Sequence, residues 1–274
     1  MLFSKFTLTI VTALVSTVAS APAQFDWNVP DDGKVDDLVT INANLNCGKL
    51  MRGLNKGDCE YMQKIGFIGQ GINAQSNNGK AWIGNNAPYT FTFINRATQP
   101  SPVPVIIVVW VRDNANDYYS MDMRRKRPYI TFSLPKVGDK VTISMPANVN
   151  GAFAALNNRQ TTLSNTGQIY NTWGEFSTGQ WATIDVSREI NMGGNVMEMK
   201  ASNGCVTNMS RCVFKCKRGN TCGAKNSYVL ENCASGSQPG AGHGTDPSTG
   251  DPSGGCGGWG YSGKGHVDVF LGRH

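Results

Sequence analysis

Two carboxylates in strand-like segments are the side chains of this chain best placed to do chemistry. Glu175 lies in the segment WGEF and Asp185 in the segment IDVS. Carboxylates are unusual on strands unless they line a cleft or meet a partner, because burying an unpaired charge is costly. Glycoside hydrolases use two carboxyl groups, about 5–5.5 Å apart for retention or about 6.5–9.5 Å apart for inversion. The pair could therefore be catalytic, line a binding cleft, or form a structural pair with Arg159 or Arg188.

The first residues predict a secretory signal. Lys5 precedes an apolar run over residues 6–18, and small residues follow as far as Ala23. Such a run is typical of a signal peptide and is too short to span a bilayer. We therefore assign residues 1–20 to the signal peptide and expect an extracellular protein. No later segment approaches the length of a membrane helix, so we expect no membrane partner.

The cysteines predict disulfide bonds rather than a metal site or a reactive thiol. Eight cysteines in an exported chain favour four disulfides, and no C-x-x-C motif is present. The three histidines have no partner at metal-ligand spacing, and the motifs of serine hydrolases and nucleotide sites are missing. We therefore expect no catalytic residue, metal or cofactor. The cysteines are Cys47, Cys59, Cys205, Cys212, Cys216, Cys222, Cys233 and Cys256.

The strongest cluster of charge is basic and lies in a predicted exposed hairpin between Val111 and Tyr129. Without Lys5 the formal net charge falls from +6 to about +5. The sequence has no dense stripe of Lys and Arg, so we expect no nucleic-acid partner. Pro128 directly follows the run and would block dibasic processing. Tyrosine and arginine are common at interface hot spots, so the hairpin is either a partner contact or a solvated loop. Its candidate contact residues are Tyr118, Tyr119, Arg124, Arg125, Lys126 and Arg127.

The N-terminal part of the mature chain predicts two short helices. Apolar residues recur at helical spacing over residues 36–45, and Asp58 could cap a second helix that carries Cys59. A Cys47–Cys59 bond would tie the two helices together and would be worth roughly 3 kcal/mol. A Gly- and Asn-rich loop is expected over residues 69–86. We therefore assign residues 21–88 to a helical and loop extension.

From residue 89 the pattern predicts strands. Apolar residues alternate with polar ones at residues 89–93, 130–134, 141–145 and 266–271, whereas residues 103–111 are almost all apolar. Short strands separated by turns favour a mainly β sandwich or barrel over residues 89–274. Its cysteine-rich segment, 203–260, contains the sequon Asn208-Met209-Ser210, where Asn208 is a candidate glycosylation site.

The order of these segments resembles the thaumatin-like proteins. Residues 138–156, the stretch 171–196, Cys205 and the segments 91–96 and 266–271 carry the resemblance. It implies a thaumatin-like antiparallel β-sandwich with a disulfide-rich C-terminal lobe. The N-terminal helical hairpin has no counterpart in that family.

The same resemblance implies a site and a disulfide map. Glu175 and Asp185 match two acids of the family's cleft, and Arg159 stands in for its arginine; that cleft is associated with β-glucan binding or weak hydrolysis. The first lobe cysteine would pair with the last and the second with the next to last. The implied bonds are Cys205–Cys256, Cys212–Cys233 and Cys216–Cys222, with purely local pairing as the rival.

The mature chain, including residues 45–50 and 59–62, also resembles a family of secreted effectors of filamentous ascomycetes. That resemblance implies a fungal virulence effector that inhibits host papain-like cysteine proteases in the plant apoplast, without enzymatic activity. A β-glucan-binding wall protein with at most weak glucanase activity is the alternative, and a structural wall protein is a third hypothesis.

Overall fold

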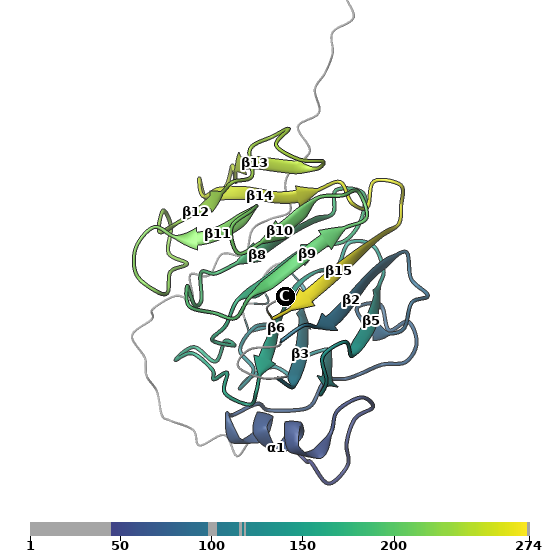
Figure 1. Ribbon diagram of the computed structural model, residues 1–274. Coiled ribbons are helices and arrows are strands. Elements are labelled where there is room, and N and C mark those ends of the chain that lie inside the picture. The colour runs from purple at the N-terminus through teal and green to yellow at the C-terminus, as the bar shows by residue number, and fades with distance from the viewer. Residues whose placement is uncertain (1–44, 98–102, 115–116, 118, 273–274) are drawn as a thin grey trace, which may run out of the picture.

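The chain folds mainly into β-structure, with two sheets packed face to face. The computed structural model describes residues 45–97, 103–114, 117 and 119–272 (Figure 1). One apolar core fills the space between the sheets, and a second core lies on the outer face of the larger sheet. The prediction of a mainly β sandwich is therefore confirmed.

The smaller sheet has six strands, and its central strands show the predicted alternation. In the strand over residues 89–95, Tyr89, Phe91 and Phe93 are buried between the sheets, while the intervening threonines are half-buried. This is the pattern of a strand with one face in the core. The strands, in spatial order, are β1 (Trp82–Ile83), β5 (Lys140–Met145), β2 (Tyr89–Asn95), β15 (Gly265–Leu271), β9 (Met197–Ala201) and β10 (Val206–Asn208).

The larger sheet has nine strands. Seven follow one path, in the order β12 (Tyr228–Glu231), β11 (Val213–Cys216), β8 (Thr183–Ser187), β7 (Trp173–Ser177), β6 (Asn150–Asn157), β3 (Val105–Val111) and β4 (Ile130–Leu134). The remaining two form a hairpin, β13 (Ala241–Thr245) and β14 (Pro252–Gly257). β14 pairs with the first half of β8 and β11 with its second half, so β8 joins the cysteine-rich lobe to the sandwich.

Both sheets are mixed: the antiparallel pairing that the resemblance implied holds except at two strand pairs. β15 runs parallel to β2 along its whole length, and β11 runs parallel to β8 over two residue pairs. In each case a long connection separates the two strands in sequence, which parallel pairing requires. The last strand thereby closes the smaller sheet by filling the place between β2 and β9.

A third layer covers the outer face of the larger sheet. Every residue of β3 is buried, as the sequence predicted for a strand covered on both faces. Its odd-numbered residues, such as Ile107, face the inner core, whereas Ile106, Val108 and Trp110 face the outer one. The N-terminal segment supplies the other side of the outer core through residues that include Leu45, Met62 and Phe67. The extension is thus part of the folded protein.

The described residues contain one helix of the expected hairpin. The helix α1 (Lys56–Lys64) is capped by Asn55, whose side chain accepts a hydrogen bond from the backbone N–H of Asp58. The predicted cap, Asp58, lies instead in the first turn. The other predicted helix falls on residues 36–45, of which all but Leu45 lie outside the described residues. β1 lies within the predicted loop 69–86 and pairs with β5, so the smaller sheet begins before residue 89.

Candidate functional site

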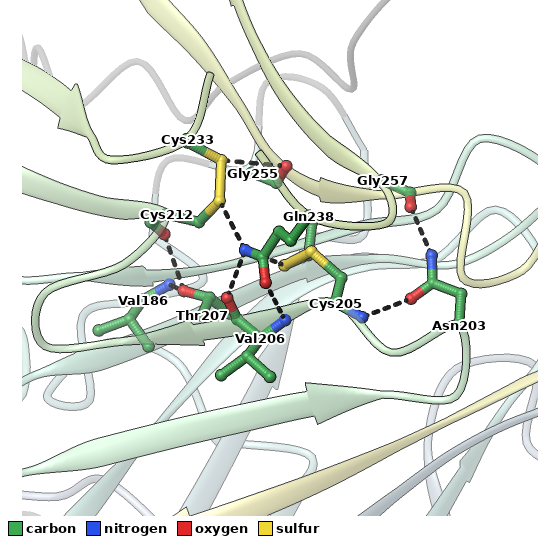
Figure 2. The surroundings of a disulfide bond; sticks show 11 residues. Val186, Asn203, Cys205, Val206, Thr207, Cys212, Cys233, Gln238, Gly255 and Gly257 are labelled. Atoms are coloured by element: carbon green, nitrogen blue, oxygen red, sulfur yellow. Dashed lines mark hydrogen bonds between the residues drawn. A yellow bond between two sulfur atoms is a disulfide. The ribbon is translucent and has the colours of Figure 1, made fainter. Parts of the chain in front are cut away.

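Two of the three disulfides in the cysteine-rich lobe lie next to each other. The structure forms Cys205–Cys256, Cys212–Cys233 and Cys216–Cys222 in the lobe and Cys47–Cys59 in the N-terminal layer, the same pairs that were expected. The side chain of Gln238 lies between the first two bonds (Figure 2). Its amide hydrogen-bonds both backbone groups of Val206 at 2.7 and 3.0 Å, with Nε2 3.3 Å from the Cys212 sulfur. The lobe is therefore cross-braced where β10, β11 and β14 meet.

Glu175 and Asp185 meet as the sequence suggested. They are directly opposite one another on β7 and β8, where side chains lie about 4.5–5.5 Å apart. Alternation puts them on the face of the larger sheet that also carries Trp173 and the outer core. A third carboxyl group, Glu189, follows just beyond the end of β8. The sequence analysis missed it because it lies outside the strand pattern.

All three carboxyl groups are buried and incompletely hydrogen-bonded. Glu175, Asp185 and Glu189 are 5%, 7% and 1% exposed. One oxygen of each has no hydrogen-bond partner among the described residues: Glu175 Oε1, Asp185 Oδ1 and Glu189 Oε2. A buried oxygen without a donor favours the protonated form of the acid, because the charge has neither water nor a partner to stabilise it.

Burial also sets the pKa values of this acid cluster, by which we mean Glu175, Asp185 and Glu189. Burial raises the pKa of Glu175 to about 8, although a hydrogen bond with Ser187 acts in the opposite direction. Burial, and then the charges of Glu175 and Glu189, raise the pKa of Asp185 well above its usual range. Burial and the charge of Glu175 do the same to the pKa of Glu189, with Asp251 adding to the effect and the Ser187 hydrogen bond opposing it.

Neither candidate arginine joins the acid cluster. Arg159 pairs instead with the buried Asp58, with Nε 2.8 Å from Oδ1. Arg188 donates through Nη2 to the carbonyl of Met192, and its Nε has no partner among the described residues. The structural ion pair proposed from the sequence is therefore not formed. Because the acid cluster is sealed, a polysaccharide could not touch Glu175 or Asp185 without displacing the residues that cover them.

Most charged side chains of the basic hairpin form contacts within the protein. Lys126 bonds to Asp113 at 2.5 Å and to Asp117, and these contacts raise its pKa despite the opposing effect of burial. Arg127 donates to the carbonyl oxygens of Gln70 and Gly71, which ties the hairpin to the N-terminal layer.

The exposed part of the hairpin is small. Arg124 and Arg125 both pair with Asp122, and the Arg125 guanidinium lies 4.9 Å above the ring of Tyr119. Tyr119 is 53% exposed. Tyr118 lies outside the described residues. Of the described candidate contact residues, Tyr119, Arg125 and Arg127 are exposed, whereas Arg124 and Lys126 are half-buried. Because Arg127 is bound to Gln70 and Gly71, Tyr119 and Arg125 are the ones most open to a partner.

Two exposed aromatic side chains form a feature that the sequence analysis missed. Trp181, in the turn between β7 and β8, and Tyr261, in the loop between β14 and β15, are 50% and 68% exposed. Their ring centroids lie 6.3 Å apart in an edge-to-face arrangement. We call this pair the aromatic edge. The signal in the sequence was the presence of aromatic residues near glycine in both loops, which resembles ordinary loop composition.

The sequon lies at the end of an edge strand. Asn208, the last residue of β10, is half-buried, and its Nδ2 donates to Glu198 Oε2 at 3.3 Å. Its Oδ1 accepts from the backbone N–H groups of Ser210 and Arg211, which forms a local turn.

Among the helices of the described ranges, none is long and apolar enough to cross a membrane.

The sandwich, the third layer and the oxidised lobe together define a disulfide-bonded extracellular β-protein. A family model described as "Allergen Asp f 4-like domain" matches residues 82–246, which is more than half of the chain. The chain therefore belongs to this family of secreted fungal allergens. No curated protein matches the chain. The family match begins at β1 and ends just after β13, so it leaves out the N-terminal layer and the last two strands.

Proposed function

We propose that this protein is a non-catalytic effector of the plant apoplast, and that it inhibits host papain-like cysteine proteases by blocking their substrate cleft. The observation that carries the proposal is the aromatic edge, because it offers two large exposed side chains from adjacent, tightly held loops. Aromatic residues dominate the hot spots of protein interfaces, and a cleft is blocked well by a narrow, apolar edge. The effector resemblance supplies the class of target.

The aromatic edge is held rigidly by its own loops. The backbone N–H of Gly258 donates to the carbonyl of Ala182, which directly follows Trp181, at 2.9 Å. A Cβ at Gly260 would lie 2.4 Å from the carbonyl oxygen of Gly179, so only glycine allows the two loops to pack this closely. The disulfide at Cys256 anchors the second loop at its base. Rigid loops lower the entropy lost on binding, and this favours tight inhibition.

The inhibition is tested with purified protein, papain and a plant papain-like protease, using a fluorogenic peptide substrate. We expect inhibition at micromolar concentration or below, and at least a tenfold loss of it in the double variant Trp181→Ala/Tyr261→Ala. Val137→Ala, which removes another exposed apolar side chain in the turn between β4 and β5, is the matched control and should inhibit normally. Absence of inhibition by the wild type would refute the function. Full inhibition by the double variant would refute the aromatic edge as its contact surface.

The hairpin supplies the second candidate contact. If Arg125→Ala weakens inhibition while the aromatic edge variant does not, the protease contacts Tyr119 and its neighbours. β-Glucan binding is the alternative function and is supported by the adjacent carboxyl groups of Glu175 and Asp185. The burial of both groups counts against it, and retention on insoluble β-1,3-glucan that is lost in Glu175→Ala and Asp185→Ala would restore it.

A further inference from the structure

A pocket at one end of the sandwich is lined by neutral polar side chains. It has a volume of about 480 Å³. It lies between the end of β6, the segment before β7, the connection from β8 to β9, and the residues just after β2 and β15. None of its lining residues in the described part of the chain is acidic, basic or histidine. Its polar lining residues are Asn157, Asn158, Gln160, Thr161, Thr162, Tyr170, Asn171, Asn191 and Asn195. We call it the amide pocket.

Part of the lining forms a rigid frame. Asn171 is 2% exposed, and its Nδ2 donates to the carbonyl of Ala155 at 2.7 Å and to Asn157 Oδ1 at 3.1 Å. Its Oδ1 accepts from the backbone N–H of Asn195 at 2.6 Å. Asn191 Nδ2 donates to the carbonyl of Tyr170. Asn157 and Asn171 are buried and Asn191 is half-buried. Their hydrogen bonds fix the walls, so the pocket does not need to be ordered when a ligand binds.

The rest of the lining keeps its hydrogen-bonding capacity free. The side chains of Asn158, Gln160, Thr162 and Asn195 form no hydrogen bond within the described part of the protein. Asn158 and Arg159 have φ values of 52° and 51°, an uncommon conformation that is costly for arginine. The turn that they form holds Asn158 and Gln160 at the pocket, while Arg159 is committed to Asp58.

We propose that the amide pocket binds a neutral carbohydrate. Each sugar hydroxyl both donates and accepts hydrogen bonds, and a primary amide offers both functions from one side chain. The described lining carries no acidic or basic side chain, which disfavours phosphates, carboxylates and metal ions, because these need opposite charge or anionic ligands. Tyr170 adds an aromatic wall, and the volume lies within the range of about 300–1,000 Å³ that is usual for ligand pockets. This site is separate from the aromatic edge and from the acid cluster.

The proposal is tested by isothermal titration of the full mature protein with three neutral hexasaccharides, from β-1,3-glucan, chitin and mannan. We expect saturable binding of at least one of them, which identifies the source of the sugar. A hexamer of galacturonic acid, which is anionic, should bind at least tenfold more weakly. Failure of all three neutral sugars to bind, or equal binding of the anionic one, would overturn the proposal.

Variants locate the binding. Gln160→Ala/Asn195→Ala removes two free amides, and Asn158→Gly removes a third while glycine accepts the positive φ. Each should weaken sugar binding at least tenfold, with thermal unfolding measured to confirm that the fold is intact. Asn165→Ala changes an exposed asparagine outside the lining and should bind as the wild type does. Binding that persists in both pocket variants would overturn the site, whatever the outcome of the protease assay.

Discussion

The acid cluster and the amide pocket show opposite ways of placing polar side chains in one sandwich. The acid cluster consists of groups that ionise, yet it is sealed, and the described residues offer it neither a counter-charge nor a donor for one oxygen of each carboxyl group. The described lining of the amide pocket consists mainly of amide side chains, which cannot ionise, yet the pocket is open, framed by internal hydrogen bonds and keeps free amides at its surface. Residue type points to the first as the functional site, whereas access and satisfied hydrogen bonds point to the second.

The largest effect that would test this comparison is the pH dependence of stability. The pKa of Glu175 is raised to about 8 in the folded state, against an ordinary value of 4.5, and the pKa values of its two neighbours are also raised. An acid whose pKa is raised by folding does not lower the free energy of unfolding while the pH is below its pKa in the unfolded chain. The free energy of unfolding then falls as the pH rises toward the pKa of the folded state. The free energy of unfolding should therefore fall by several kcal/mol between pH 5 and pH 8. Denaturant unfolding across this range measures it, and a flat profile would contradict a sealed, uncompensated cluster.

A second prediction replaces the acids with neutral amides of the same shape. Glu175→Gln and Asp185→Asn should each stabilise the protein at pH 8 by about 1–3 kcal/mol, because they remove a charge that burial disfavours. At pH 5 the gain should be much smaller, because the raised pKa values favour the protonated, uncharged acids in the wild type. Glu60→Gln, which changes an exposed acid of α1, should leave the unfolding curve nearly unchanged at both pH values. Destabilisation at pH 8 would show that the carboxylates are stabilised by contacts that their ionised forms require.

The smallest expected effect concerns Arg159, which lies beside the amide pocket and pairs with Asp58. Arg159→Ala should destabilise the protein by about 1–2 kcal/mol, since Asp58 is 1% exposed and would lose its cation. The partial exposure of Arg159 limits the loss. Sugar binding should be unaffected, because Arg159 is not part of the lining. Unfolding and titration of the same sample would separate a structural role from a role in binding, and a large loss of affinity would extend the pocket to this residue.

The parts of the fold that follow a period were predictable from the sequence. Alternation located β2, β4, β5 and β15, and the continuous apolar run of β3 correctly indicated a strand covered on both faces. β1 was missed because two residues are too few to show a period. The cap of α1 was misplaced because Asn55 and Asp58 are both good cap residues, and their reciprocal hydrogen bonds decide which one takes that place.

The candidate sites were less predictable because tertiary contacts make them. The strand pattern was enough to bring Glu175 and Asp185 together, but it could not show that the third layer and its neighbours would leave them sealed. Arg159 was linked to the acids by resemblance, and a left-handed turn directs it to Asp58 instead. The amide pocket combines residues from several irregular segments, which have no period to reveal it.

The boundary of the matched allergen domain has a practical consequence for anyone who produces it. The match starts at Trp82, but the partners of Trp110 and Trp173 in the outer core include Leu54, Met62 and Phe67, which precede it. A recombinant fragment cut at that boundary would expose the apolar outer face of the larger sheet. Such a fragment would be prone to aggregation. Antibodies raised against it would recognise a surface that is buried in the intact protein.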